Sequence, residues 1–201
     1  MPEPKPGSKD PWEIYYENTT DLKPANCLKA AVEILGRSGN ALDLDCGAGR
    51  DSRYLLSKGF RVIALDGEKS SEEFIQKLKT AGNIEFVCSA FDMYEYPKNY
   101  FDIVNAQFAL PFNPPHTFNK VFLSIRESLK PGGIFVGQLF GDHDEWNVPT
   151  SKMTFHTKQE AMQLVEGMDI IEFDEEDNPN GTLANGSPKH WHTFTITFRK
   201  P

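Results

Sequence analysis

The 201-residue sequence has few cysteines, no long apolar run and no excess of basic residues. Its three cysteines, Cys27, Cys46 and Cys88, are too few and too scattered for a disulfide framework or a paired-cysteine zinc site. No apolar segment approaches the roughly 18 residues of a membrane-spanning helix, and the first residues lack the apolar core of a signal peptide. These absences predict a cytoplasmic protein that has reduced cysteines and uses no metal.

Charge and composition narrow the class of protein further. The chain has 29 Asp and Glu against 21 Lys and Arg, a formal net charge of −8, which disfavours a surface that follows nucleic acid or an anionic membrane. With 39% hydrophobic residues, 14 Pro and 15 Gly, the composition is that of one globular domain with a sizeable core. A nucleic-acid or membrane partner is therefore not expected, and the composition leaves monomer and homodimer both open.

The N-terminal part differs in composition from the rest. Residues 1–11 contain four prolines and show no periodicity, which predicts a flexible tail. We expect residues 12–201 to form a single domain. Within it, residues 12–36 supply an aromatic lid, with Trp12, Tyr15 and Tyr16, and then an amphipathic helix over 25–35.

The middle of the chain alternates short apolar runs with helical stretches, which is typical of parallel βαβ units. The last third instead predicts a helix over 158–165 and a hairpin at the sheet edge, with strands at 170–173 and 191–198 joined by a loop over 174–189. The expected fold is therefore α/β: a three-layer, Rossmann-like domain whose seven-stranded, mostly parallel sheet ends in an antiparallel strand. The expected parallel strands cover 41–44, 61–66, 84–88, 101–108 and 134–140, and the helices between them 52–58, 71–80 and 118–129.

The stretch LDLDCGAGRD, residues 42–51, leads from an apolar strand through a turn of small residues into a helix. Glycines there let a ligand approach the backbone beside the helix N-terminus. Dehydrogenases, flavoproteins and methyltransferases share this feature, and so do tight turns without a ligand. The carboxylates of Asp43, Asp45 and Asp51 would repel a pyrophosphate and suit a ligand that carries an ammonium or sulfonium group.

Two further acidic residues follow the next strands. Asp66 ends the second strand, 19 residues after Gly47, where a carboxylate can accept hydrogen bonds from a ribose diol. A dehydrogenase shares that feature. Asp92 follows the third strand beside apolar residues and could hold an adenine, or it could be an ordinary capping or loop aspartate.

Several motifs together resemble the class I S-adenosylmethionine-dependent methyltransferases: LDLDCGAGRDSRYLLSKGFRVIALD, the position of Asp92, FDIVNAQFALPF and SLKPGG. Others, namely GRDSRYLLSKGF, LPFNPP, GQLFGDHDEW, MTFHT and PKHWHTF, are similar to the bacterial tellurite-resistance and thiopurine-type small-molecule methyltransferases. The resemblance covers residues 12–200. It implies S-adenosylmethionine as cofactor and S-adenosylhomocysteine as product.

The resemblance also implies which residues bind the cofactor. They are Tyr16, Asp43, Asp45, Cys46, Gly47, Gly49, Asp66, Gly67, Phe91, Asp92, Met93, Ala106 and Gln107. These methyltransferases usually have glycine at the position of Asp45. The aspartate either contacts the cofactor ammonium, which we expect, or displaces the turn and weakens binding.

The acceptor side is expected in the second half of the chain. All five histidines follow residue 115, and His190 and His192 would share one face of a strand. Histidine can act as a base or a counter-charge near neutral pH, so His190, His192 and His156 are the candidate catalytic residues. The two strand histidines lack an evident third ligand for a metal.

Four aromatic residues are expected to line the acceptor pocket, and three of them, Phe108, Phe140 and Trp146, follow the carboxyl ends of strands, where ligands bind in open α/β sheets. The four are Phe108, Phe112, Phe140 and Trp146. Asn113-Pro114-Pro115-His116 is similar to the NPPY motif of amino-methyltransferases. It lies too far beyond the strand and has His for Tyr, so we interpret it as a turn.

The expected function is methyl transfer from S-adenosylmethionine to a small molecule: a soft sulfur, selenium or tellurium atom, a small anion or an amine. Such an in-line displacement needs mainly positioning and desolvation. Two alternatives remain. A protein or nucleic-acid acceptor is disfavoured by the net charge of −8, and the substitution at Asp45 allows a catalytically idle nucleotide-binding or sensor protein.

Overall fold

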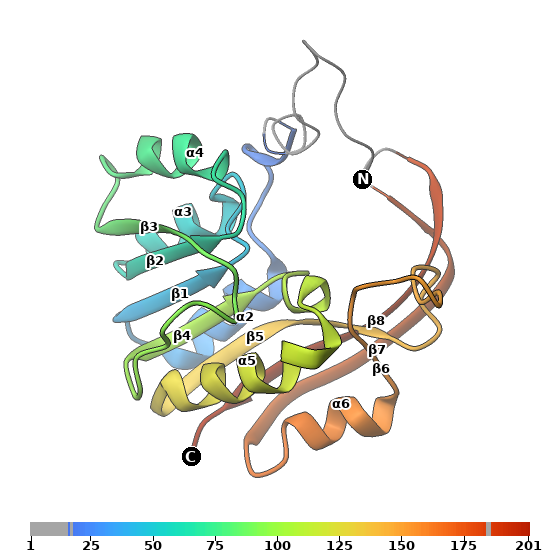
Figure 1. The fold of residues 1–201 in the computed structure, drawn as a ribbon. Helices are drawn as coiled ribbons and strands as arrows, with labels where there is room; N and C mark the ends of the chain where they lie inside the picture. The colour runs from blue at the N-terminus through green and yellow to red at the C-terminus, as the bar shows by residue number, and fades with distance from the viewer. Residues whose placement is uncertain (1–15, 17, 184–185) are drawn as a thin grey trace.

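The computed structural model describes residues 16, 18–183 and 186–201 (Figure 1). The predicted tail and the lid residues Trp12 and Tyr15 lie outside this part. The elements are, in chain order, α2 (Asn26–Leu35), β1 (Asn40–Leu44), α3 (Arg50–Ser57), β2 (Arg61–Asp66), α4 (Ser71–Leu78), β3 (Ile84–Cys88), β4 (Phe101–Ala106), the 3₁₀ helix η1 (Leu110–Phe112), α5 (Pro115–Ser128), β5 (Leu129–Gly141), β6 (Phe155–His156), α6 (Lys158–Leu164), β7 (Asp169–Thr182) and β8 (Pro188–Arg199).

One sheet in the order β3-β2-β1-β4-β5-β8-β7 forms the centre of the molecule, and the short β6 pairs with β5. The pairs from β3 to β5 are parallel, whereas β8 is antiparallel to both of its neighbours. The prediction of a seven-stranded, mostly parallel sheet with an antiparallel C-terminal strand is confirmed. Because β1 lies between β2 and β4, the strand order reverses there, and ligands of open α/β sheets bind at the carboxyl ends of such strands.

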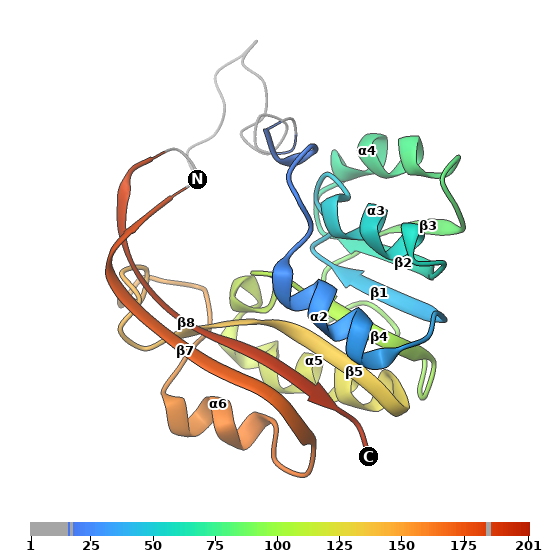
Figure 2. The same ribbon diagram turned by 180° about the vertical axis from the view of Figure 1, so that it is seen from behind.

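Helices cover both faces of the sheet. In Figures 1 and 2, α5 and α6 lie on one face and α2 and α3 on the other. Successive side chains of β5 pack into the cores on opposite faces of the sheet, because strand side chains alternate. Phe135 packs with Phe122 of α5, and Val136 belongs to the cluster that contains Leu28 of α2. β4 is buried along its whole length, as expected for a parallel strand covered on both faces.

One glycine and one capping box determine where α3 and α6 begin. Gly49 precedes α3 with φ of 77°, and a Cβ there would lie 2.7 Å from the Leu78 side chain, so only glycine lets α3 start this close to α4. α6 begins with a capping box, in which Thr157 and Glu160 each bind the other's backbone N–H. No helix within 18–183 or 186–201 is long and apolar enough to span a bilayer.

The C-terminal hairpin is longer than the sequence suggested. The prediction of a loop over 174–189 was wrong, because Asp174–Thr182 continues β7 and Pro188–His190 begins β8. The last pair between β5 and β8 is Phe140 with Thr193, so residues 188–192 extend past the end of β5 and pair only with β7. This cross-strand ladder overrides the low strand propensity of Asp, Asn and Gly. The extension projects beyond the parallel strands (Figure 1).

Candidate active site

The turn between β1 and α3 has an unusual backbone that Asp66 helps to hold. Asp45, Gly47 and Gly49 all have left-handed conformations, with φ of 58°, 50° and 77°. The Asp66 carboxylate, at the end of β2, accepts hydrogen bonds from the backbone N–H groups of Gly47 and Glu68, both at 2.8 Å. The resembling methyltransferases usually have glycine at the position of Asp45. The left-handed conformation there explains this preference, because glycine has no Cβ and adopts it without strain.

Asp43 is buried behind the turn and fully hydrogen-bonded. One of its oxygens accepts from the Ser52 hydroxyl at 2.6 Å and the other from the Asn105 amide at 2.7 Å. Burial, and then the nearby charge of Asp51, raise its pKa to about 7. Asp43 therefore links β1, α3 and β4 and changes its protonation close to neutral pH.

Asp45 is the carboxyl group of the turn that remains exposed. Although solvent reaches it, desolvation by the surrounding protein, followed by the charges of Asp66, Asp43 and Glu68, raises its pKa to about 8. Several acids crowded at one place repel one another when ionised. A cationic group placed beside them would relieve that repulsion, which is the property expected of a site for an ammonium or sulfonium.

The residues predicted to frame an adenine lie along the neighbouring strand ends. Asp66 and Cys88 pair at the ends of β2 and β3, so the loop that follows β3 begins beside Asp66. Gly67 has open space where a Cβ would stand, Phe91 and Asp92 are half-buried, and Met93 is 74% exposed. An exposed, flexible thioether can adapt to the flat face of a ligand.

Three other predicted cofactor residues are buried. The Tyr16 ring packs edge-on to Phe74, with ring centroids 5.7 Å apart, and a Cβ on Gly47 would lie 3.3 Å from it. The one described residue of the predicted lid thus lies against the glycine turn. Cys46 and Ala106 are buried too, and burial raises the pKa of the Cys46 thiol.

A chain of amide hydrogen bonds leads from this turn toward the end of β5. The Gln107 amide donates to Asn105 at 2.8 Å, and its oxygen accepts from the Gln138 amide at 3.0 Å and the Cys27 thiol at 3.2 Å. The Gln138 oxygen accepts from the backbone N–H of Phe108 at 3.1 Å. Phe108 has φ of 54°, so this bond holds a strained residue in place. Sequence reasoning missed Gln138 and Cys27, because their partners are distant in sequence.

The four aromatic residues predicted for the acceptor pocket do come together. Phe140 is fully buried and contacts the rings of Phe108, Phe112 and Trp146 at centroid distances of 6.3, 6.1 and 5.7 Å. Trp191 of β8, which sequence reasoning missed, joins them at 5.8 Å from Phe140. We call these five rings the aromatic cluster. The alternation of side chains along β8 could have revealed Trp191, because it places Trp191 on the opposite face of the strand from His190 and His192.

A buried ion pair lies against the aromatic cluster. Lys189 and Asp144 are 2% and 3% exposed, and the ammonium lies 2.5 Å from the carboxylate. The ammonium also stands over the rings of Trp191 and Trp146, at 3.8 and 4.2 Å from their centroids. Both residues were absent from the predicted site. The pair fixes the segment after β5, because Asp144 also accepts from the backbone N–H of Trp146 at 3.0 Å.

The strand histidines are bound by carboxylates. His190 Nε2 lies 2.5 Å from one oxygen of Asp177 on β7, and His143 Nδ1 lies 2.9 Å from the other. These bonds lower the pKa of Asp177 to about 2. The bond to Asp177 is also the main reason why the pKa of His143 is raised. His190 is therefore oriented by β7.

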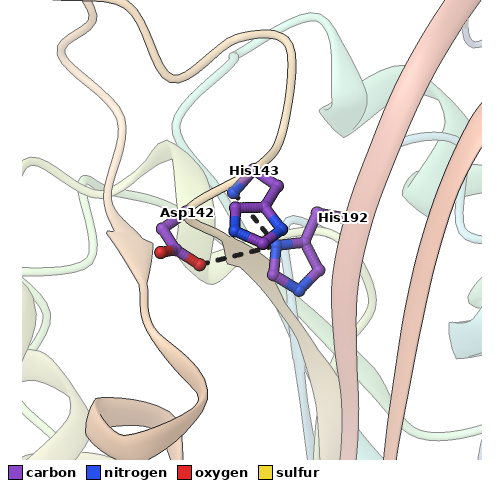
Figure 3. Close-up of side chains that lie close together, drawn as sticks. All are labelled: Asp142, His143 and His192. Carbon is purple, nitrogen blue, oxygen red and sulfur yellow. Dashed lines mark hydrogen bonds and ion pairs between the residues drawn. The ribbon is translucent and has the colours of Figure 1, made fainter.

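His192 is surrounded by polar groups of the turn after β5 (Figure 3). Its Nδ1 accepts from the backbone N–H of His143 at 3.0 Å and lies 3.6 Å from Asp142, while its Nε2 lies 3.2 Å from Glu175. The rings of His143 and His192 stack, with centroids 4.8 Å apart. Asp142, His143 and His192 are close enough to resemble a metal site. The Nδ1 lone pair of His192, however, already accepts the backbone N–H of His143.

His156 lies on the short strand β6, where it pairs with Gly141 of β5, and the His192 ring stands over the same glycine. His156 is buried against Phe118 of α5, with ring centroids 4.6 Å apart, and burial lowers its pKa to about 4. It is therefore a neutral imidazole near pH 7.

Comparison with known proteins identifies the family. The family model described as tellurite resistance protein TehB matches residues 10–187. The chain belongs to the TehB family. It is thus a member of a family of S-adenosylmethionine-dependent methyltransferases, and the predicted resemblance is confirmed.

Solved structures agree on the fold. TehB from Haemophilus influenzae superimposes with a TM-score of 0.78 at 21% identity, over 94% of this TehB-family chain and 67% of that one. A Burkholderia thailandensis 1,6-didemethyltoxoflavin-N1-methyltransferase, solved with that molecule and S-adenosylhomocysteine, gives 0.68 at 19% identity, over 94% and 85% of the chains. The N-methyltransferase NodS from Bradyrhizobium japonicum, solved with S-adenosylhomocysteine, gives 0.67 at 16%, over 96% and 89%.

A sequence relative is an uncharacterized methyltransferase of Synechocystis. It is 30% identical over 95 residues, which are 47% of this chain and 43% of that protein. The match spans less than half of that relative's length. Family and fold are therefore established, while the acceptor has to be argued from the site.

Proposed function

We propose that this TehB-family protein binds S-adenosylmethionine and methylates a small molecule. One observation carries the proposal: the glycine turn with its carboxyl groups and the aromatic cluster lie at the carboxyl ends of adjacent strands, linked by the amide chain from Asn105 to Phe108. The first part suits a cationic nucleoside ligand and the second an apolar acceptor. Their connection suits a reaction between the two.

The residues present fit the cofactor. Asp45 offers an exposed carboxyl group whose pKa is raised to about 8 by desolvation and then by the neighbouring acids, and we assign it to the cofactor ammonium. Asp66 would hold the ribose, and Phe91, Asp92 and Met93 the adenine. When bound, the cofactor supplies a methyl group on a positively charged sulfur.

The chain's own contribution is positioning and exclusion of water. The acceptor's lone pair forms the bond to the methyl carbon while the carbon–sulfur bond breaks and its electron pair returns to sulfur. Phe108 and Phe112 would keep water from these atoms. An acceptor without a proton to lose, such as a thiolate, needs no base in this scheme.

For acceptors that lose a proton, His190, His192 and His156 remain the candidate bases. We expect His190→Ala to lower turnover of an amine at least about tenfold, since the bond to Asp177 holds the His190 imidazole in one orientation. Turnover of a thiol and affinity for S-adenosylhomocysteine should stay unchanged. Lost cofactor affinity would remove His190 from the acceptor side.

The first test is calorimetric titration with S-adenosylhomocysteine, with NADH as the control ligand. We expect micromolar binding of S-adenosylhomocysteine alone, followed by methylation of at least one acceptor in a screen of thiols, amines and small anions. Binding of neither ligand would contradict the proposal and favour the idle-fold alternative.

A further inference from the structure

The aromatic cluster presents apolar surface where the acceptor is proposed to bind. Phe108 and Phe112 are 44% and 45% exposed, although both rings contact the fully buried Phe140. Trp146 and Trp191 flank them with centroids 5.4 Å apart. Rings from η1, the turn after β5 and β8 thus meet at one place. Grouped, partly exposed rings of this kind mark binding sites.

Among the described residues, the ammonium that stands over the rings of the cluster is not free to bind an anion. Lys189 is the one ammonium that stands over these rings, and it is buried and paired with Asp144 at 2.5 Å. If an anionic acceptor drew Lys189 away, Asp144 would be left buried and unpaired, which is costly. A small hydrated oxyanion would find no free counter-charge on the rings, and of the two indole N–H groups that of Trp191 already donates to the Thr182 carbonyl.

The charges nearest the ion pair also disfavour an anion. His190 and His143 are both held by Asp177, and His192 lies beside Glu175. Glu145 accepts the backbone N–H of His190. Each of these imidazoles is therefore matched by a carboxylate, so the three histidines offer an oxyanion no unpaired positive charge.

A cationic acceptor is disfavoured for a different reason. The faces of Trp191 and Trp146 that could attract a cation already hold the Lys189 ammonium at 3.8 and 4.2 Å. A second positive charge against the same rings would be repelled by the first. The exposed surface of Phe108 and Phe112 and the exposed parts of the two indoles instead complement an uncharged, flat ring through offset or edge-on packing.

We propose that the acceptor is an uncharged aromatic or heteroaromatic molecule bound against Phe108, Phe112, Trp146 and Trp191, and not a small oxyanion. This rests on the proposed methyl transfer and names the acceptor class of that site. The Lys189–Asp144 pair then acts as a positioning element that orients the two indoles.

The test measures acceptor binding separately from catalysis. Protein saturated with S-adenosylhomocysteine is titrated calorimetrically with 2-mercaptobenzimidazole (a flat, uncharged ring), cyclohexanethiol (apolar but not flat) and tellurite (an oxyanion). Methylation of each by S-adenosylmethionine is measured as S-adenosylhomocysteine formed. We expect the flat ring to bind and react at least ten times better than the other two.

Variants connect the result to the rings. Phe112→Ala and Trp146→Leu should each weaken binding of the flat ring about tenfold and leave affinity for S-adenosylhomocysteine unchanged. Leu123→Ala, which removes a similarly exposed apolar side chain on α5, is the matched control and should change neither. Phe112 is partly exposed in a short 3₁₀ helix, so its variant should fold even if Trp146→Leu does not.

Two results would overturn the proposal: tellurite binding or reacting better than the flat ring, or ring affinity unchanged in Phe112→Ala. Either can occur while S-adenosylhomocysteine binds normally, and then only the acceptor class is wrong. Failure of S-adenosylhomocysteine to bind would instead contradict the proposed function itself.

Discussion

At the scale of single residues, Asp66 combines two tasks. Its carboxylate holds the turn by accepting from Gly47 and Glu68, and its position at the end of β2 suits a ribose. Asp66→Ala should weaken binding of S-adenosylhomocysteine by about 1–3 kcal/mol, because hydrogen bonds to a charged group are lost. Asp66→Asn, which keeps one acceptor oxygen, should weaken it less. Unchanged calorimetric affinity in Asp66→Ala would refute the assignment.

Asp43 and Asp45 make cofactor binding depend on pH. Their pKa values of about 7 and about 8 mean that both are partly protonated near neutrality. An ammonium group of the ligand placed beside them favours the ionised forms, so binding should release protons and affinity should rise from pH 6 to pH 8. Titrations of S-adenosylhomocysteine in buffers of different ionisation enthalpy measure this release. It should shrink in Asp45→Asn, and proton uptake in the wild-type protein would contradict the assignment.

Local sequence predicted some site residues and not others. The glycine turn and Asp66 could be recognised because a strand, a turn and a helix follow one another directly in the chain. Gln138, Lys189 and Trp191 could not, since their partners lie 30 or more residues away and depend on which strands pair and in which register. The roles of His190, His192 and His156 stay predictions.

At the scale of elements, the start of α3 depends on close packing. Gly49 and Gly167 share a φ of 77°, but a Cβ on Gly49 would meet Leu78 at 2.7 Å and Ile75 at 2.9 Å, whereas one on Gly167 would meet nothing within 4 Å. Gly167→Ala therefore costs only backbone strain. Gly49→Ala adds overpacking of about 1–3 kcal/mol.

Urea unfolding of the two glycine variants measures this difference. Gly49→Ala should lose more stability than Gly167→Ala, and it should also bind S-adenosylhomocysteine more weakly because the turn shifts. Equal losses in the two variants would mean that α3 and α4 separate easily.

The predicted boundaries of helices and strands were most accurate where the hydrophobic pattern of the sequence was clear. The helix at 158–165 and the strands at 61–66 and 84–88 agree with α6, β2 and β3 to within a residue, because apolar periodicity and caps marked them. β7 departed most, since a strand exposed along nearly its whole length has no apolar alternation to reveal it.

At the scale of the whole molecule, stability should vary with pH in two directions. Asp43 and Asp45, whose pKa values are raised, bind more protons when folded, so their contribution falls as pH rises from about 4 toward 7–8. His156, whose pKa is lowered to about 4, binds fewer when folded, so its contribution grows between pH 4 and 6.5. The effects oppose each other below pH 6.5, and above it the carboxyl groups dominate.

The melting temperature of the free protein should therefore fall between pH 6.5 and 8. Saturating S-adenosylhomocysteine, whose ammonium compensates the ionised carboxyl groups, should flatten this slope. Calorimetric scans with and without the ligand provide the measurement. A melting temperature that rises over this interval would show that other titrating groups outweigh Asp43 and Asp45.

The long hairpin has a consequence for how copies of the molecule meet. β7 is an edge strand of 14 residues, and an edge of that length offers unpaired N–H and C=O groups to any other strand. Glu172, Asp174, Glu175, Glu176 and Asp177 follow one another along it. Two such edges brought together would set like charges side by side, so the acidic run that obscured this strand in the sequence also protects the protein from aggregation.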